Sequence, residues 1–137
     1  MHKGEQGFTI IELVTVTVLI AILSVTLFSR IGNFSSTAVN ASRDDVIAAL
    51  FFAQQTAMAR SNIQLIITSN SVSVTENGAP IVVHNKGYPL TLASGVTATP
   101  ATLSYDKLGR TTATTIGLSS TSGASASIVV EASGYAH

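Results

Sequence analysis

The feature that most constrains this chain is an apolar run that begins at Phe8 and ends at Phe28. An α-helix rises 1.5 Å per residue, so a run of this length can cross a hydrocarbon core of roughly 30 Å. Only one residue within the run, Glu12, carries a charge. The sequence therefore predicts a membrane-spanning helix that contains one acidic residue.

Glu12 is unusual in such a segment. An ionised side chain within a membrane helix costs on the order of 2.5–3.5 kcal/mol on insertion scales. We therefore expect a positively charged partner for its carboxylate.

The residues before the helix do not form an ordinary secretory signal. Such a signal carries its small-residue cleavage site after the apolar core, whereas here a short polar leader ends on Gly7, before the run. Cleavage at Gly7 would leave the whole helix on the mature protein. Lys3 in the leader predicts a cytoplasmic amino terminus, with the bulk of the chain on the other side of the membrane.

The stretch Gly7-Phe8-Thr9-Ile10-Ile11-Glu12 resembles the processing site of type IV pilins and of the pseudopilins of type II secretion. The resemblance implies that prepilin peptidase cuts between Gly7 and Phe8 and that Phe8 is then N-methylated. It also implies that Glu12 pairs with the amino terminus at Phe8 of a neighbouring subunit. The alternative is a plain single-pass anchor, which explains neither Gly7 nor Glu12.

The same resemblance implies a set of partners and a location. The partners are prepilin peptidase, other pilin or pseudopilin subunits bound through the amino-terminal helix, and the assembly platform of the inner membrane. The chain would lie in the bacterial inner membrane with its carboxy-terminal domain in the periplasm, and would then enter a pilus or pseudopilus.

The chain divides into four expected segments: a leader at 1–7, a transmembrane or filament-core helix at 8–29, an amphipathic helix at 30–61 and a β-rich globular part at 62–137. Within the amphipathic helix, residues 32–42 are rich in Ser, Asn and Thr, which favour helices poorly. Two interpretations of residues 32–42 remain equally open: a segment that melts on assembly, and a continuous helix whose polar residues form its solvated face. Ser42 and Asp45 have the spacing of a capping box, which predicts a possible restart of the helix.

The helix that follows has one apolar face with a 3.6-residue period, formed by Val46, Ile47, Leu50, Ala53, Ala57 and Met58. We expect this face to carry a sheet, with Met58 as core filler.

After residue 62 the apolar period changes to two, which indicates strands. The expected strands are 63–68, 71–75 and 81–84, then 90–92, 103–105, 114–118 and 127–132. Asn77-Gly78 predicts a hairpin over 71–84, and the Ser/Thr-rich stretch 119–127 predicts a mobile loop. The expected fold is α+β and pilin-like, with one long amino-terminal helix packed on an antiparallel sheet.

Composition excludes several kinds of chemistry. The chain has no cysteine, which rules out disulfides and zinc ligation through sulfur, and its formal net charge is +0. A catalytic or metal site would depend on His84 with Asp106 or Glu131, and we expect neither an enzyme nor a bound metal or cofactor. A basic patch of Lys86, Lys107 and Arg110 with Tyr88 and Tyr105 is too small for firm nucleic-acid binding, so DNA is an improbable partner.

The carboxy-terminal half resembles a narrower group, the GspH and FimT minor pilins and pseudopilins. The similarity lies in Tyr105-Asp106-Lys107-Leu108-Gly109-Arg110, in Ile128-Val129-Val130 and in Gly134. Some members of that group bind DNA through basic residues after the terminal glycine, where this chain has Tyr135-Ala136-His137. The resemblance therefore favours a minor pilin, with a mannose-sensitive haemagglutinin type pilus as the first candidate system. A GspH-like pseudopilin and a FimT-like DNA-uptake pilin are the alternatives.

Overall fold

The computed structural model describes the backbone of residues 8–83 and 86–137, and the side chains of these residues except 28–34, 83 and 86. Gly7 and His84, both named above as candidate site residues, lie outside the described residues. Contacts divide the chain between Phe34 and Ser35 into two compact units, which are described separately.

A single helix, α1, runs from Ile10 to Ala59. Its backbone is helical through residues 32–42, so the possible restart at Ser42 is wrong. Ser42 is instead fully buried, and its Oγ accepts a hydrogen bond from the backbone N–H of Ala93 at 3.1 Å. The polar side chain is therefore used to attach a loop to the helix, which a local capping pattern cannot reveal. Melting of 32–42 in a filament stays a prediction.

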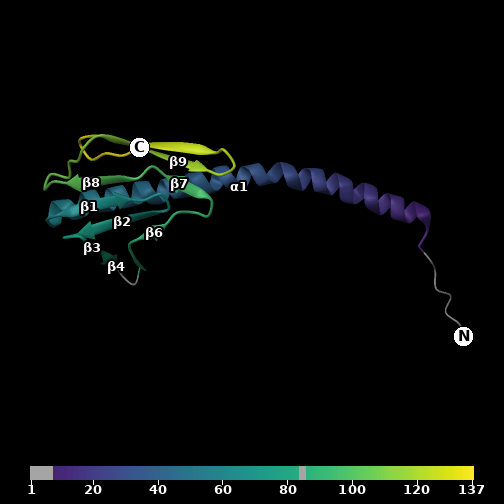
Figure 1. The fold of residues 1–137 in the computed structure, drawn as a ribbon, viewed down its shortest axis with the longest axis horizontal. Helices are drawn as coiled ribbons and strands as arrows, with labels where there is room; N and C mark the ends of the chain where they lie inside the picture. Colours follow the sequence, from purple (N-terminus) through teal and green to yellow (C-terminus); the bar gives the residue numbers. More distant parts are fainter. Residues whose placement is uncertain (1–7, 84–85) are drawn as a thin grey trace, which may run out of the picture. The chain divides into compact units, whose positions relative to one another are not determined.

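The unit that begins at Ser35 contains two main antiparallel sheets beside the second half of α1 (Figure 1). In the larger sheet the strand order is β3-β2-β1-β8, and β6 also pairs with β2. Its strands are β1 (Ile63–Ile67), β2 (Ser71–Glu76), β3 (Ala79–Pro80), β6 (Leu90–Thr91) and β8 (Ala101–Tyr105).

The smaller sheet has the order β10-β9-β7. Its strands are β7 (Val96–Ala98), β9 (Thr114–Ser120) and β10 (Ser125–Val130). A separate short pair joins β4 (Val82–Val83) to β5 (Lys86–Gly87).

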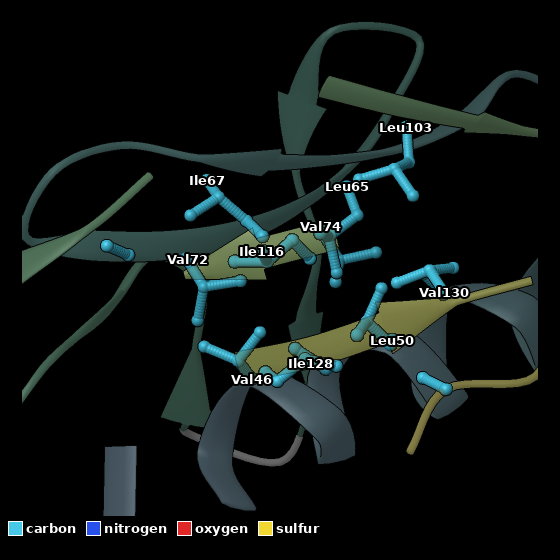
Figure 2. Packing of buried hydrophobic residues seen from close by; sticks show 14 of the residues in the cluster. Val46, Leu50, Leu65, Ile67, Val72, Val74, Leu103, Ile116, Ile128 and Val130 are labelled. Atoms are coloured by element: carbon cyan, nitrogen blue, oxygen red, sulfur yellow. The ribbon is translucent and has the colours of Figure 1, made fainter. Parts of the chain in front are cut away.

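The core lies where α1 and the two sheets meet, as Figure 2 shows. Leu65 on β1 lies opposite Val74 on one neighbouring strand and Leu103 on the other, so the period-two apolar pattern stacks in register. Val46 and Leu50 come from α1, and the strands of the smaller sheet contribute Ile116, Ile128 and Val130. The predicted α+β fold, with a long helix on antiparallel strands, is confirmed.

Several local expectations are wrong. Met58 is about half exposed rather than core filler, because the helix turns that residue away from the sheets. The expected returning strand 81–84 forms only in part: β3 pairs with β2 at Thr75–Pro80 and Glu76–Ala79, and the Ile81 N–H still donates to Val74 O at 2.9 Å. Val82 and Val83 then leave the hairpin and form β4, which pairs with β5. Much of the expected loop 119–127 is ordered, because β9 and β10 extend into it and pair from Ser119 and Ser125 inward.

The carboxy terminus folds back along β10. The backbone groups of Val129 and His137 donate to each other at 2.9 and 3.0 Å, and Val130 and Ala136 form an isolated bridge. This short return covers the outer edge of β10.

Candidate assembly site at the amino-terminal helix

The start of α1 is fixed by Thr9, which occupies the capping position just before Ile10. The backbone N–H of Glu12 donates to Thr9 Oγ1 at 3.3 Å and to Thr9 O at 3.1 Å. The backbone N–H of Leu13 donates to Thr9 O at 3.2 Å. The Leu13 bond is the first regular bond of the helix, and the Thr9 side chain satisfies the Glu12 N–H, one of the groups that a helix start leaves without an intrahelical partner.

Glu12 is the third residue of the helix and its side chain is exposed. A carboxylate in the first turn interacts favourably with the positive end of the helix dipole, typically by about 0.3–1 kcal/mol. That is less than the cost of placing the charge in lipid, so the helix alone does not compensate it. Among the described residues no salt bridge involves Glu12, which leaves its carboxylate open to a cation from another molecule.

The other polar side chains of this segment bond to their own helix. Thr15 donates to Ile11 O and Ser24 to Ile20 O, both at 2.7 Å. Thr17 and Thr26 donate to the carbonyl three residues earlier, at 2.9 and 2.8 Å. These hydroxyls therefore need no outside partner, which suits a helix in apolar surroundings.

The large apolar side chains from Phe8 to Leu27 are exposed. Ile10–Leu27 is long and apolar enough to cross a membrane, and none of that segment is buried in the structure. Such exposure of consecutive apolar residues indicates a surface that lipid or other helices cover.

Thr9 is the residue of this site that the sequence-based prediction missed. The signal was available, because Thr9 and Glu12 have the Ser/Thr-x-x-Glu spacing of a capping box. The Glu12 N–H bond to Thr9 Oγ1 is one half of that motif.

Asp106, one of the residues considered for catalysis, serves the local fold. Asp106 Oδ1 accepts the backbone N–H groups of Arg110 and Leu108, each at 2.9 Å, and its Oδ2 accepts Arg110 Nε at 2.8 Å. The Arg110 backbone bond is the largest cause of a lowered pKa at the Asp106 carboxyl. Within the described residues no group of three or more potential metal ligands exists.

Of the small basic patch, Arg110 and the two tyrosines are engaged in contacts of their own, and the Lys86 side chain lies outside the described ones. Arg110 is paired with Asp106. Tyr105 is buried, and Tyr88 is half-buried with its ring stacked on Phe52 at 5.7 Å between centroids. Tyr105 is therefore not available for stacking on bases, and one face of the Tyr88 ring is occupied by Phe52.

The fold is similar to that of the type IV minor pilin FimU of Pseudomonas aeruginosa, with a TM-score of 0.52 and 14% sequence identity. The match covers 72% of this chain and 90% of that one. No family model matches this chain, and no curated protein matches its sequence. The likeness shows a pilin-like fold, with a long amino-terminal helix packed on antiparallel sheets.

Proposed function

We propose that this chain is a minor type IV pilin-like subunit that takes part in pilus assembly or initiation. The observation that carries the proposal is an exposed apolar helix with an unpaired carboxylate in its first turn, on a chain with a minor pilin fold. Prepilin peptidase would cut between Gly7 and Phe8, and N-methylation of Phe8 would follow. The new amino terminus would then lie one residue before the Thr9 cap.

The proposed mechanism uses charge and packing together. Glu12 of one subunit pairs with the positively charged amino group at Phe8 of its neighbour, which provides the cation that the carboxylate lacks among the described residues of its own chain. Lipid is as apolar as a bundle of these helices, so burial alone does not favour the bundle. Close packing and the ion pair therefore supply the preference for the filament over the bilayer.

The proposed partners follow from this mechanism. They are the peptidase, the inner membrane with its assembly platform, and other pilin or pseudopilin subunits. DNA is not among them, because the residues after Gly134 are Tyr135, Ala136 and His137 and carry no Lys or Arg.

The test compares Glu12→Ala with Glu131→Ala, a matched control at another exposed glutamate. Both variants should be processed to the same mature amino terminus. We expect Glu12→Ala to fall at least about tenfold in sheared filaments, because removing one partner of a desolvated ion pair costs about 3–5 kcal/mol. Normal incorporation of Glu12→Ala would refute the proposed role of the carboxylate.

A further inference from the structure

The turn that joins β2 to β3 (Figure 1) holds two asparagines against each other. Asn62 Nδ2 donates to Asn77 Oδ1 at 2.9 Å, and the Asn77 backbone N–H donates to Asn62 O at 3.1 Å. Asn62 lies between the end of α1 and the start of β1, and both asparagines have positive φ, at 56° and 53°. The side-chain carbonyl of Asn77 is therefore held by an N–H donor of its own chain.

The residue after Asn77 is Gly78, and no other asparagine of the chain is followed by a glycine. Asn77 and Gly78 are exposed, and a Cβ placed at Gly78 meets nothing within 4 Å. Among the described residues, no hydrogen bond occupies the Gly78 backbone N–H or the Asn77 Nδ2 group. With Asn62 and Gln64 they line an open hollow of about 330 Å³, so water reaches both groups.

Asn70 lacks this combination. It is also exposed, and its Oδ1 also accepts a hydrogen bond, from Thr68 Oγ1 at 3.2 Å. The next backbone N–H, that of Ser71, donates to Thr68 Oγ1 at 3.1 Å. The backbone nitrogen after Asn70 is therefore engaged, whereas the one after Asn77 is free of such a bond within the described part of the chain.

We propose that Asn77 is a site of spontaneous deamidation in the folded chain, and that Asn62 promotes the reaction. The Gly78 backbone nitrogen gives its proton to hydroxide and attacks Cγ of Asn77. A bond forms between this nitrogen and Cγ, the bond between Cγ and Nδ2 breaks, and Nδ2 takes a proton from water and leaves as ammonia. Water then opens the succinimide ring at either carbonyl, which yields aspartate or isoaspartate at position 77.

The contribution of Asn62 comes from the hydrogen bond it already makes. As the nitrogen attacks Cγ, negative charge collects on Asn77 Oδ1, and the Asn62 Nδ2–H that points at this oxygen binds the charged form more strongly. A donor placed in advance at an oxygen that becomes negative lowers the barrier to acyl transfer. The free Asn77 Nδ2 and the absence of a Cβ at Gly78 leave the leaving group and the nucleophile accessible.

The product changes both the charge and the backbone of this corner of the fold. A carboxylate at position 77 adds a negative charge beside Glu76, whose Oε2 accepts a hydrogen bond from Arg60 Nη1 at 2.9 Å. Isoaspartate also lengthens the main chain within a turn whose flanking residues, Glu76 and Ala79, pair with each other. Deamidation therefore alters the place where the end of α1 meets the β2–β3 hairpin.

The test follows the full chain in mild detergent at mildly alkaline pH, in water that carries a heavy oxygen isotope. Peptide mapping measures the mass gain of an amide-to-acid exchange and the uptake of the label at each asparagine. We expect conversion at Asn77 well before any at Asn70. A folded chain in which Asn77 keeps its amide, or converts no sooner than Asn70, would overturn the proposal.

A matched pair of variants isolates the Asn62 donor. Asn62→Asp replaces a donor by an acceptor of nearly the same shape, and aspartate tolerates positive φ. We expect it to slow conversion at Asn77 at least about threefold, less than the roughly 100–1,000-fold that loss of such a donor costs in a closed active site. Gln64→Glu makes the same amide-to-acid change in the same hollow, at a side chain that bonds to Ser104, and should leave the rate unchanged.

Both variants are also measured in urea, where the contact between Asn62 and Asn77 is lost. There the two variants and the unsubstituted chain should convert at equal rates. Conversion of folded Asn62→Asp as fast as that of the unsubstituted chain, or faster, would show that the bond restrains Asn77 instead of promoting the reaction. An equal slowing by Gln64→Glu would assign the effect to charge alone, and either result would overturn the role of Asn62.

Discussion

The Gly134 position offers the sharpest quantitative prediction from the fold. Gly134 and Gly123 have nearly the same positive φ, 85° and 91°. A Cβ at Gly123 meets nothing within 4 Å, whereas a Cβ at Gly134 overlaps Gly109 O and lies 2.6 Å from Gln54 Nε2. Gly123→Ala is therefore a control for the backbone cost of Gly134→Ala.

The expected difference follows from the bonds that the tail makes. Both substitutions place alanine in the left-handed region, at a cost of about 1–2 kcal/mol. Gly134→Ala must also displace the carboxy-terminal tail, which is held by Gln54 and by the Val129–His137 and Glu131–Tyr135 backbone bonds. Loss of two or three such bonds at about 0.5–1.5 kcal/mol each brings the total cost of Gly134→Ala to about 2–6 kcal/mol.

The assay is urea unfolding of the full chain in mild detergent, monitored by the near-ultraviolet circular dichroism of the tyrosines. The chain has 3 tyrosines and no tryptophan, and this signal reports the globular unit rather than the apolar helix. A free energy of unfolding for Gly134→Ala within about 0.5 kcal/mol of that for Gly123→Ala would refute the reasoning. A difference of that size is within the ordinary error of predicting a substitution's effect on stability from the contacts that it removes.

Three further predictions concern single side chains. Thr9→Ala should destabilise the start of α1 by about 1 kcal/mol and should speed amide hydrogen exchange at Glu12 and Leu13. Thr9→Ser should restore the cap, and unchanged exchange in Thr9→Ala would contradict the capping role. Ser42→Ala should lower the free energy of unfolding by about 1–3 kcal/mol, because the Ala93 N–H loses its acceptor; an unchanged urea midpoint would contradict this. Burial raises the pKa of Tyr105 to about 12, so stability should fall as pH rises from about 10, where the unfolded tyrosine ionises, to about 12. The Tyr105 hydroxyl is buried and has no hydrogen-bond partner in the described part of the chain, so Tyr105→Phe should be neutral or stabilising and should weaken this alkaline dependence. A loss of stability above about 1 kcal/mol at pH 7 would contradict the prediction.

The parts of the fold that local pattern controls could be predicted from sequence. The apolar run, the 3.6-residue face that includes Val46 and Leu50, and the alternation at Ile63–Ile67 each depend on periodicity, and all three form the expected elements. The Asn77-Gly78 turn also depends on local conformation: Asn77 and Gly78 both adopt positive φ.

The parts that sequence could not predict depend on partners far along the chain. Ser42 reads locally as a cap, but its hydrogen-bond partner lies at Ala93. The spacing of Met58 places it on the apolar face of α1, yet its side chain lies beside Gly109. Gly109 is held at the helix by the hydrogen bond that Gln54 donates to its carbonyl. β7 was not predicted, because Val96–Ala98 is short and gains its partners from β9.

The candidate assembly site could be predicted from sequence only in part. Glu12 was identified from its chemistry in an apolar run, and its surroundings in the structure supply no compensating cation among the described residues. Thr9 needed only the capping-box spacing to be noticed.

The central claim is that this chain is processed as a pilin-like subunit and keeps its apolar helix. The most direct test is the intact mass and amino-terminal fragment of the protein isolated from the membranes of cells that express it with a prepilin peptidase. The account predicts a chain that begins at Phe8 and carries one added methyl group. A chain that keeps residues 1–7, or one cut after the apolar run, would contradict it.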